Sequence, residues 1–418
     1  MKFLTKSKLA HGIVAGALVA AGMTSVGAPA KAADDVLTLG AALSFSGKYS
    51  TNGKHTKNGY DLAVQKVNEM GGVKIGDKTY KLEIKYYDDE SVPARGAQLV
   101  ERLVQQDGVK FMLGPYSSGM TKAMAPVTEK YGVPMVEGNG ASRSLFNKGY
   151  KYLFAVLSTS EQYLAESINL AAENAAAIGK KPNEITVALA MENDPFSQDI
   201  RAGVLDDAAK YDMKIVIDDK LPKELNDMTA TLTKVKALKP DLLIVSGHSK
   251  GAALAIRQVD EMKADTAMLA MTHCEAAAIQ DKFPGKSDYT LCATQWAETL
   301  TYEDKWFGTA KEYADLFRAT FDGYTVVPYQ AAESTASVLV YVDAFERAGS
   351  LDQDAVRDAL AATEMQTFYG NIKFSPAGNN IAKPMVLRQI IDGKYVVVAP
   401  SKWAEKPVVF PKPNWDQR

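Results

Sequence analysis

The feature that most constrains the fold is an alternation that occurs twice along the chain, in which short apolar runs are separated by longer amphipathic stretches. The short runs predict buried strands, and the amphipathic stretches, with apolar residues at helical spacing, predict helices. A repeated strand–helix order predicts parallel sheets with helices on both faces. Two such series predict an α/β fold with two doubly wound, parallel-sheet lobes.

The predicted elements follow the two series and then change in character. Predicted strands are residues 36–43, 80–87, 109–113, 133–136, 185–190, 213–217, 241–245, 267–271 and 289–294. Predicted helices are residues 54–70, 93–106, 121–131, 196–211, 228–238, 251–262, 275–281, 303–322, 330–348 and 352–362. The chain closes with a predicted strand pair, 385–391 and 395–398, because Asp392-Gly393 between them is a hairpin signal.

The first 32 residues have the pattern of a secretory signal peptide. Lys2, Lys6 and Lys8 form a positive start, residues 12–22 form an uncharged run, and residues 30–32 (Ala-Lys-Ala) offer a cleavage site. The uncharged run is too short for a comfortable membrane anchor. We therefore expect cleavage after residue 32 and a soluble protein outside the cytoplasm.

Charge and motifs exclude several classes of function. The chain has 48 Lys and Arg against 50 Asp and Glu, and no run of five like charges, so it does not resemble a nucleic-acid-binding protein. Its four His and two Cys show no metal-ligand spacing, and no phosphate-binding glycine loop is present. We expect no metal and no cofactor. The acidic pairs at 88–89 and 218–219 are interpreted as solvated strand ends.

The two cysteines, Cys274 and Cys292, are 18 residues apart. Paired cysteines are stable in an oxidising compartment. Cys274 follows one predicted strand and Cys292 lies in the next, and consecutive strands are often neighbours. We therefore predict a disulfide, with two small buried apolar side chains as the alternative.

The motif Gly247-His248-Ser249-Lys250-Gly251 has the form of a serine nucleophile elbow, and it joins a predicted strand to a predicted helix. Such a nucleophile also needs an acid and then a histidine later in the chain. Only His273 follows, 24 residues after Ser249 (273 − 249). We interpret the motif as a tight strand-to-helix loop, and a secreted serine hydrolase acting through Ser249 remains the alternative from another class.

In open α/β sheets, ligands bind beyond the carboxyl ends of the strands. The loops there are residues 115–119, 137–142, 192–196, 246–249 and 272–274. Ser117 and Ser118 place hydroxyls at a predicted helix start, where N–H groups and the helix dipole favour a carboxylate. The alternative is a serine that only caps the helix. With the small polar loop at 139–142, this predicts contact with a ligand.

The same segments resemble the periplasmic binding proteins of ABC importers, of the leucine/isoleucine/valine-binding type. The resemblance covers nearly all of residues 36–398, and the order and spacing of its segments make it specific. The segments are LGAALSFSG (39–47), NGYDLA (58–63), NEMGGV (68–73), YDDE (87–90), LGPYSS (113–118) and YGVP (131–134).

This resemblance implies a type I periplasmic binding protein without catalytic activity, in which two lobes joined by a three-strand hinge close on a ligand. The expected lobes are residues 34–157 plus 297–365 and residues 158–296 plus 366–418. The expected partners are a small-molecule ligand and the membrane permease and ATPase subunits of an importer. The protein itself is expected to be a monomer.

The resemblance also implies ligand-binding residues in the first lobe. Ser118 matches a serine that holds the ligand carboxylate, and Asn139 matches a residue that offers its backbone carbonyl. Ala141, or Ser142 after a shift of one residue, matches a threonine that binds both ends of an amino acid. Asn52 matches a tyrosine near the first helix.

In the second lobe, Phe196 and His248 match tyrosines that line the cleft. Thr272 stands where the branched-chain binders have a glutamate that pairs with the ligand ammonium, so an acid must come from elsewhere if the ligand is an amino acid. The candidates are Glu275, three positions later, and Glu137, which ends a first-lobe strand.

We therefore expect a small carboxylate-bearing ligand. A branched-chain or other amino acid comes first, and an aromatic or short-chain carboxylate comes next. The alternative within the same fold is a sensor of an amide or urea.

Overall fold

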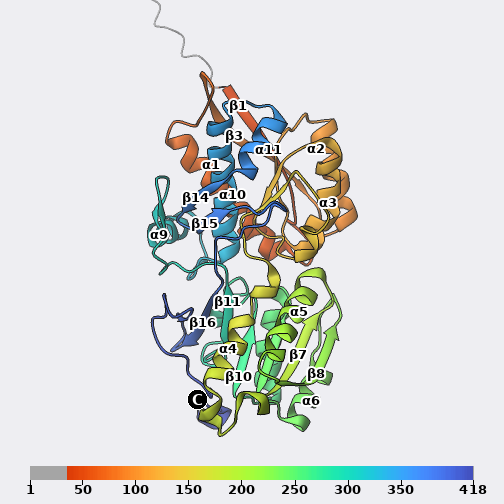
Figure 1. Cartoon of the computed structure of the whole chain (residues 1–418), viewed down its shortest axis with the longest axis vertical. Helices are drawn as coiled ribbons and strands as arrows, with labels where there is room; N and C mark the ends of the chain where they lie inside the picture. Colours follow the sequence, from red (N-terminus) through yellow and green to blue (C-terminus); the bar gives the residue numbers. More distant parts are fainter. Residues whose placement is uncertain (1–34, 418) are drawn as a thin grey trace, which may run out of the picture. The chain divides into compact units, whose positions relative to one another are not determined.

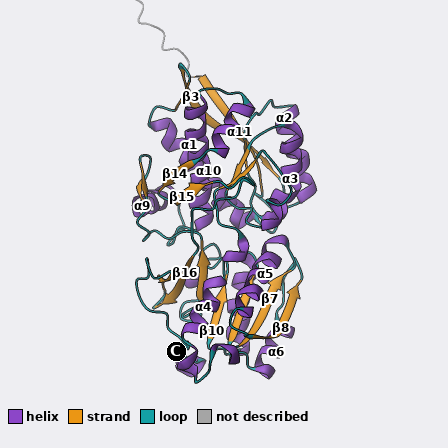
Figure 2. Ribbon diagram, in the orientation of Figure 1, coloured by secondary structure: helices purple, strands orange, loops and turns teal. Residues whose placement is uncertain are grey.

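The computed structural model describes residues 35–417, so the predicted signal peptide at 1–32 lies outside the described residues. The described chain folds into two large sheets, each covered by helices (Figures 1 and 2). Within residues 35–417, no helix combines the length and the apolar character needed to cross a bilayer.

The first sheet has the strand order β2-β3-β1-β4-β5-β6. Its neighbouring strands are parallel, except in the antiparallel β2–β3 hairpin. Its strands are β1 (Asp35–Leu43), β2 (Val73–Ile75), β3 (Lys78–Asp88), β4 (Met112–Leu113), β5 (Met135–Glu137) and β6 (Leu153–Ala155). Its helices are α1 (Ser50–Glu69), α2 (Pro93–Gln105), α3 (Ser118–Tyr131), α10 (Tyr329–Ala348) and α11 (Gln353–Ala361). We call this unit the first lobe.

Alternating side chains of β1 show how both faces of this sheet are covered. Leu39 and Leu43 belong to the cluster of α1 and α10 residues, whereas Ala42 belongs to the cluster of α2 and α3 residues. Helices α2 and α3 lie side by side on their face (Figure 1). A strand buried on both faces has no polar side to alternate with, which is why β1 is apolar without interruption from Leu39 to Leu43.

The second sheet has the strand order β17-β16-β11-β10-β9-β7-β8. Its strands are β7 (Thr186–Glu192), β8 (Lys214–Leu221), β9 (Leu242–Ser246), β10 (Met268–Met271), β11 (Leu291–Thr294), β16 (Val386–Ile391) and β17 (Lys394–Ala399). Its helices are α4 (Ala165–Glu173), α5 (Pro195–Ala209), α6 (Thr229–Leu238), α7 (Ser249–Met262) and α8 (Ile279–Lys282). This unit is the second lobe, and β16 and β17 form the predicted antiparallel hairpin at its edge.

The parallel parts of the two sheets have the same order. In β3-β1-β4-β5-β6 and in β8-β7-β9-β10-β11, the second strand of each series lies outside the first, and the later strands follow on the other side. This is a doubly wound order with a switch point beside the first strand of each lobe. The structure thus confirms the predicted fold class, with added antiparallel strands at the edges.

The chain passes between the lobes three times, and the three passing segments are hydrogen-bonded together. The Ser158 hydroxyl donates to the Lys383 carbonyl (2.6 Å), and the Ser158 N–H donates to Gln295 Oε1 (3.2 Å). Lys383 Nζ donates to the Gln295 carbonyl. One residue from each crossing therefore meets the other two. The predicted lobe boundaries at 157, 296 and 365 stay predictions.

Three local predictions are wrong. The helix predicted at 275–281 is reduced to the short α8, because Ala278 within it has a positive φ angle that a helix does not allow. The helix predicted at 303–322 begins only at α9 (Ala310–Thr320), capped by Thr309, and a short hairpin of β12 (Glu303–Asp304) and β13 (Gly308–Thr309) precedes it. A further hairpin follows at β14 (Glu364–Thr367) and β15 (Gly370–Lys373).

Asp89 is the third correction. It is fully buried rather than solvated, because its carboxylate accepts hydrogen bonds from the Ser44 hydroxyl and the Ser91 N–H.

Candidate functional site

The carboxyl ends of strands from both lobes meet at one enclosed cavity. It is lined by loops after β4, β5, β9 and β10, by the starts of α5 and α10, and by one residue from the first crossing. The lining residues are Tyr116, Ser117, Ser118, Asn139, Tyr163, Phe196, His248, His273, Tyr329, Gln330 and Glu333. Four of the predicted ligand-binding residues, Ser118, Asn139, Phe196 and His248, are among them.

The start of α3 forms one side of this cavity. Ser117 is the N-cap residue, and its hydroxyl accepts from the Met120 N–H (3.3 Å). Its φ of +83° is unusual for a residue other than glycine, and such strain concentrates at functional sites. Ser118 is the first helical residue, and its hydroxyl accepts from the Ser142 N–H (3.0 Å). The Ser118 proton is therefore free to be donated to a ligand carboxylate beside the helix N-terminus.

The loop after β5 is held by Glu137 and packs against α10. One Glu137 oxygen, Oε2, accepts from the N–H groups of Asn139 (2.7 Å) and Gly140 (2.5 Å). Burial raises the pKa of Glu137 to about 7, although these N–H groups oppose the shift. Gly138 passes so close to α10 that a Cβ would lie 2.8 Å from the Glu333 carbonyl oxygen, so the loop needs glycine there. Asn139 Nδ2 then donates to Ser334 Oγ (3.1 Å).

The opposite side of the cavity is aromatic and comes mainly from the second lobe. Phe196 stacks on His248 with 5.9 Å between the ring centroids. The Tyr116 hydroxyl, from the first lobe, lies 2.7 Å from His248 Nδ1 and 2.8 Å from His273 Nε2. Burial lowers the pKa of His273 well below its ordinary value, so this imidazole is neutral at pH 7. Its φ of +61° is a second strained position at the site.

Four predicted residues do not line this cavity. The Ser142 hydroxyl pairs with that of Ser144 (2.9 Å), and the Ala141 carbonyl accepts from the Ser160 N–H (2.8 Å). Thr272 Oγ1 donates to the Gly247 carbonyl (3.0 Å). Asn52 Oδ1 accepts from Ser249 Oγ of the second lobe (2.8 Å). Contact between these residues and a ligand stays a prediction.

The sequence analysis missed the contribution of α10. Gln330 and Glu333 lie three positions apart and therefore on the same helix face, and both line the cavity. Both are 1% exposed. Tyr329, at the start of the helix, and Tyr163, after the first crossing, add two more aromatic walls. The only sequence signal was the unusual run of polar residues within the otherwise apolar helix.

Several polar atoms of this wall have no hydrogen-bond partner among residues 35–417. They are Asn139 Oδ1, Gln330 Oε1, Gln330 Nε2 and Glu333 Oε1. Buried polar atoms are nearly always paired, so a group of unpaired atoms around one cavity requires an explanation. Burial, and then the neighbouring Glu137 carboxylate, raises the pKa of Glu333 well above its ordinary value. A bound polar molecule would supply the missing partners.

The lobes are in contact around this cavity, which is nearly filled by protein. About 10 Å³ remains for the centre of a water-sized sphere, about the room that one water molecule needs. Contacts between the lobes close it off. They are Lys48–Glu192 (3.4 Å), Asn52–Ser249 (2.8 Å), His55–Ala276 (3.2 Å) and Arg143–Asp199 (2.7 Å). A solute therefore enters only when the lobes move apart.

The second candidate acid from the sequence, Glu275, is committed elsewhere. Glu275 Oε1 lies 2.7 Å from Arg388 Nη2, and it accepts from the Thr294 hydroxyl (2.7 Å). Both charged residues are buried. Removing one partner of such a buried pair leaves an uncompensated charge, so this pair is better explained by structure than by ligand binding.

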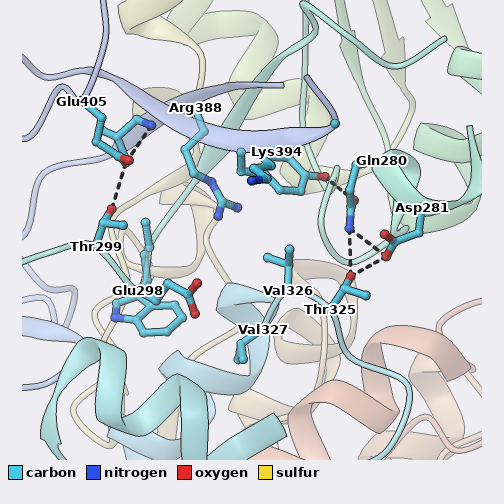
Figure 3. A pocket seen from close by; sticks show the side chains of 15 residues that line it. Gln280, Asp281, Glu298, Thr299, Thr325, Val326, Val327, Arg388, Lys394 and Glu405 are labelled. Atoms are coloured by element: carbon cyan, nitrogen blue, oxygen red, sulfur yellow. Dashed lines mark hydrogen bonds between the residues drawn. The ribbon is translucent and has the colours of Figure 1, made fainter. Parts of the chain in front are cut away.

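A second cavity lies against β16 and β17 and leaves about 330 Å³. Figure 3 shows the Arg388 guanidinium pointing into it. Arg388 is already paired with Glu275, and three further carboxylates, Asp281, Glu298 and Glu405, line the walls. The lining also includes Lys394, and Glu298 is paired with Arg318, so charge alone does not decide between the two cavities. None of the predicted ligand-binding residues lies there, so we assign the site to the first cavity.

A possible metal cluster adjoins the site but has the character of a structural network. Among the described residues, Glu192, Asp194 and His248 offer ligand atoms within 4.8 Å of one another. Lys48 lies 3.4 Å from Glu192, and Asp194 caps α5 by accepting from the Ser197 N–H (3.0 Å). Lys48 therefore pairs with one of these acids, while the other caps a helix and lies 3.3 Å from His248 Nε2.

Two other predicted features have clear places in the second lobe. Cys274 and Cys292 form a disulfide between neighbouring strands, with 5.8 Å between their Cα atoms. Ser249 begins α7 and donates its hydroxyl to Asn52, not to a histidine. The geometry of Ser249 is that of a helix-start residue at the lobe interface.

Comparison with known proteins places this geometry in a family. The chain is 23% identical to the Leu/Ile/Val-binding protein homolog 8 of Brucella suis, over 96% of this chain and 99% of that one. It is similar in fold to LivJ of Streptococcus pneumoniae in complex with isoleucine, with a TM-score of 0.76, 23% identity, and coverage of 88% and 100%. A solute-binding protein of R. palustris in complex with benzoate gives a TM-score of 0.76, 17% identity, and coverage of 90% and 98%.

The family model described as periplasmic binding protein matches residues 36–394. This match covers all three crossings, the first lobe, and the second lobe as far as the start of β17. The family consists of solute-binding proteins of ABC transporters and not of enzymes, in agreement with the geometry of Ser249. The chain therefore belongs to the family of periplasmic binding proteins, with the type I fold of two lobes.

Proposed function

We propose that this chain is the soluble periplasmic component of an ABC importer that captures a small carboxylate-bearing solute. An amino acid is the first candidate, and an aromatic or short-chain carboxylate is the second. The observation that carries the proposal is the enclosed cavity between the lobes, to which Ser118 and Asn139 contribute from one lobe and Phe196 and His248 from the other.

The mechanism is closure about the three crossings. Separated lobes expose the α3 N-terminus, whose N–H groups and Ser118 hydroxyl suit a carboxylate. A ligand that also touches Phe196 and His248 favours the closed arrangement, because it gains contacts there that the open one lacks. A monomer in this closed state would then be recognised by the permease and delivered to the transporter with its ATPase subunits.

A thermal-shift screen of the mature protein tests the proposal, because a ligand that binds only the folded state raises the melting temperature. The panel contains leucine, isoleucine, valine, benzoate, 4-methylpentanoate and acetamide. We expect a carboxylate to raise the melting temperature. A shift with acetamide alone would favour an amide sensor, and no shift with any carboxylate would refute the proposal.

A further inference from the structure

We propose that Glu333 is the acceptor for a ligand ammonium group, so that the solute is an α-amino acid. This inference rests on the proposed function and adds the class of substrate. The acid would come from α10 of the first lobe, and not from the second-lobe loop after β10, where Thr272 stands.

The position of Glu333 fits this role. It lines the cavity, and its Oε1 has no partner in the described part of the chain. Its other oxygen, Oε2, lies 3.3 Å from the Tyr369 hydroxyl, which can donate to it. A buried carboxylate oxygen without a donor is costly, and a ligand N–H would remove that cost.

The neighbours of Glu333 complete a pattern that matches both ends of an amino acid. Asn139 Oδ1 and Gln330 Oε1 are two further acceptors without partners among residues 35–417, so three acceptors surround the same space. An ammonium group has three N–H donors. The donors for a carboxylate, Ser118 and the α3 N-terminus, line the same small cavity. The α-amino and carboxylate groups of one ligand are adjacent and can therefore meet both sets at once.

The competing explanation is that Glu333 is only a structural counter-ion for Lys383. Lys383 is buried, and burial lowers its pKa to about 7. Its Nζ, however, donates to the Gln295 carbonyl and lies 4.4 Å from the centre of the Tyr369 ring. Lys383 and Glu333 interact electrostatically, but no ion pair within 4.0 Å joins them among the described residues, and Glu333 Oε1 has no hydrogen-bond partner there.

The test is a calorimetric cycle with leucine and 4-methylpentanoate, which is leucine without its amino group. Wild type is compared with Glu333→Gln, a change of nearly equal size. We expect wild type to bind leucine at least about tenfold more tightly than 4-methylpentanoate, as for a hydrogen bond to a buried charge. Glu333→Gln should weaken the affinity for leucine by at least about tenfold and change the affinity for 4-methylpentanoate by less than about threefold.

Controls separate the inference from the proposed function. Glu346→Gln makes the same change at an exposed position of α10 and should bind both compounds as wild type does. Equal losses for both compounds in Glu333→Gln would show a structural role and overturn the inference, as would a selective loss in Glu137→Gln alone. The preference of the wild type is measured first, so the test stands even if a variant fails to fold. If wild type binds leucine and 4-methylpentanoate equally well, or binds benzoate but not leucine, the inference is overturned and the proposed function stands. If no carboxylate of the thermal-shift panel binds, both the inference and the proposed function are refuted.

Discussion

The two lobes share one strand order, yet they bring different chemistry to the cavity. The first lobe presents hydroxyls, amides and a carboxylate, several of whose polar atoms have no partner within residues 35–417. The second lobe presents Phe196, His248 and His273, whose rings pack on one another, and the two histidines are hydrogen-bonded to Tyr116. Under the proposed function, the first lobe would bind the charged ends of the ligand, and the second would supply a shaped wall that completes the site on closure.

The lobes also differ in what stabilises them. The largest predicted effect on stability comes from removing the disulfide of the second lobe. The Cys274–Cys292 bond lies wholly within the second lobe. It closes a loop of 18 residues, and replacing both cysteines by serine should lower the free energy of unfolding by about 3 kcal/mol. Urea unfolding of the two proteins measures this. Two free thiols in denatured, unreduced wild type would show that the bond does not form.

Acid should weaken the contact between the lobes at His55. Its Nε2 donates to the Ala276 carbonyl (3.2 Å), its Nδ1 lies 2.9 Å from the Tyr324 hydroxyl, and burial lowers its pKa from 6.5 to about 4. The His55 imidazole therefore binds a proton more readily in the unfolded chain than in the folded one. The stability due to neutral His55 is complete above pH 6.5 and is lost as pH falls to about 4, by at most about 3 kcal/mol.

The variant His55→Gln isolates this effect from other titrating groups. Free energies of unfolding are measured by denaturant between pH 7 and pH 4. Wild type should lose more stability than the variant over this range, and parallel curves would contradict the assignment.

The polar wall of the first lobe is tested by Ser118→Ala. Ser118 Oγ accepts from the Ser142 N–H, so its own proton is available to a carboxylate. We expect ligand affinity to fall by about 1.5–3 kcal/mol, the range for a hydrogen bond to a charged group. Calorimetry with leucine measures it, and Ser144→Ala, a nearby hydroxyl outside the cavity, is the matched control. An unchanged Kd would remove Ser118 from the site.

The smallest predicted effect concerns closure without ligand contact. The Ser249 hydroxyl donates to Asn52 of the other lobe, and this bond exists only when the lobes meet. Ser249→Ala should weaken leucine binding by about 0.5–1.5 kcal/mol, the net value of a neutral hydrogen bond. A loss larger than that of Ser118→Ala would reverse the roles assigned to the two lobes. Labelling of Ser249 by a fluorophosphonate would instead revive the hydrolase alternative.

Much of the fold was predictable because its central strands, such as β7, β9 and β10, consist mainly of buried apolar residues. Such runs stand out even in one sequence, and their carboxyl ends fix where the loops with Ser118, Asn139, Phe196 and His248 gather. The disulfide followed from the same logic, since Cys274 and Cys292 fall at neighbouring strands.

The features that could not be predicted from the sequence depend on contacts between segments that are distant along the chain. Helix α10 enters the first lobe only after the second crossing, so nothing local marks Gln330 and Glu333 as neighbours of Asn139. The burial of Asp89 likewise depends on Ser44, 45 residues earlier. The false helix at 275–281 had suitable local propensity, but Ala278 has a positive φ angle, and the observed helix begins only after it.

The most direct test of the account is a crystal structure of the mature protein grown with leucine. The account predicts leucine between the lobes, with its carboxylate within hydrogen-bond distance of Ser118 and its ammonium beside Glu333 Oε1. Leucine bound in the cavity near Arg388, or bound between the lobes with its ammonium away from Glu333, would contradict it.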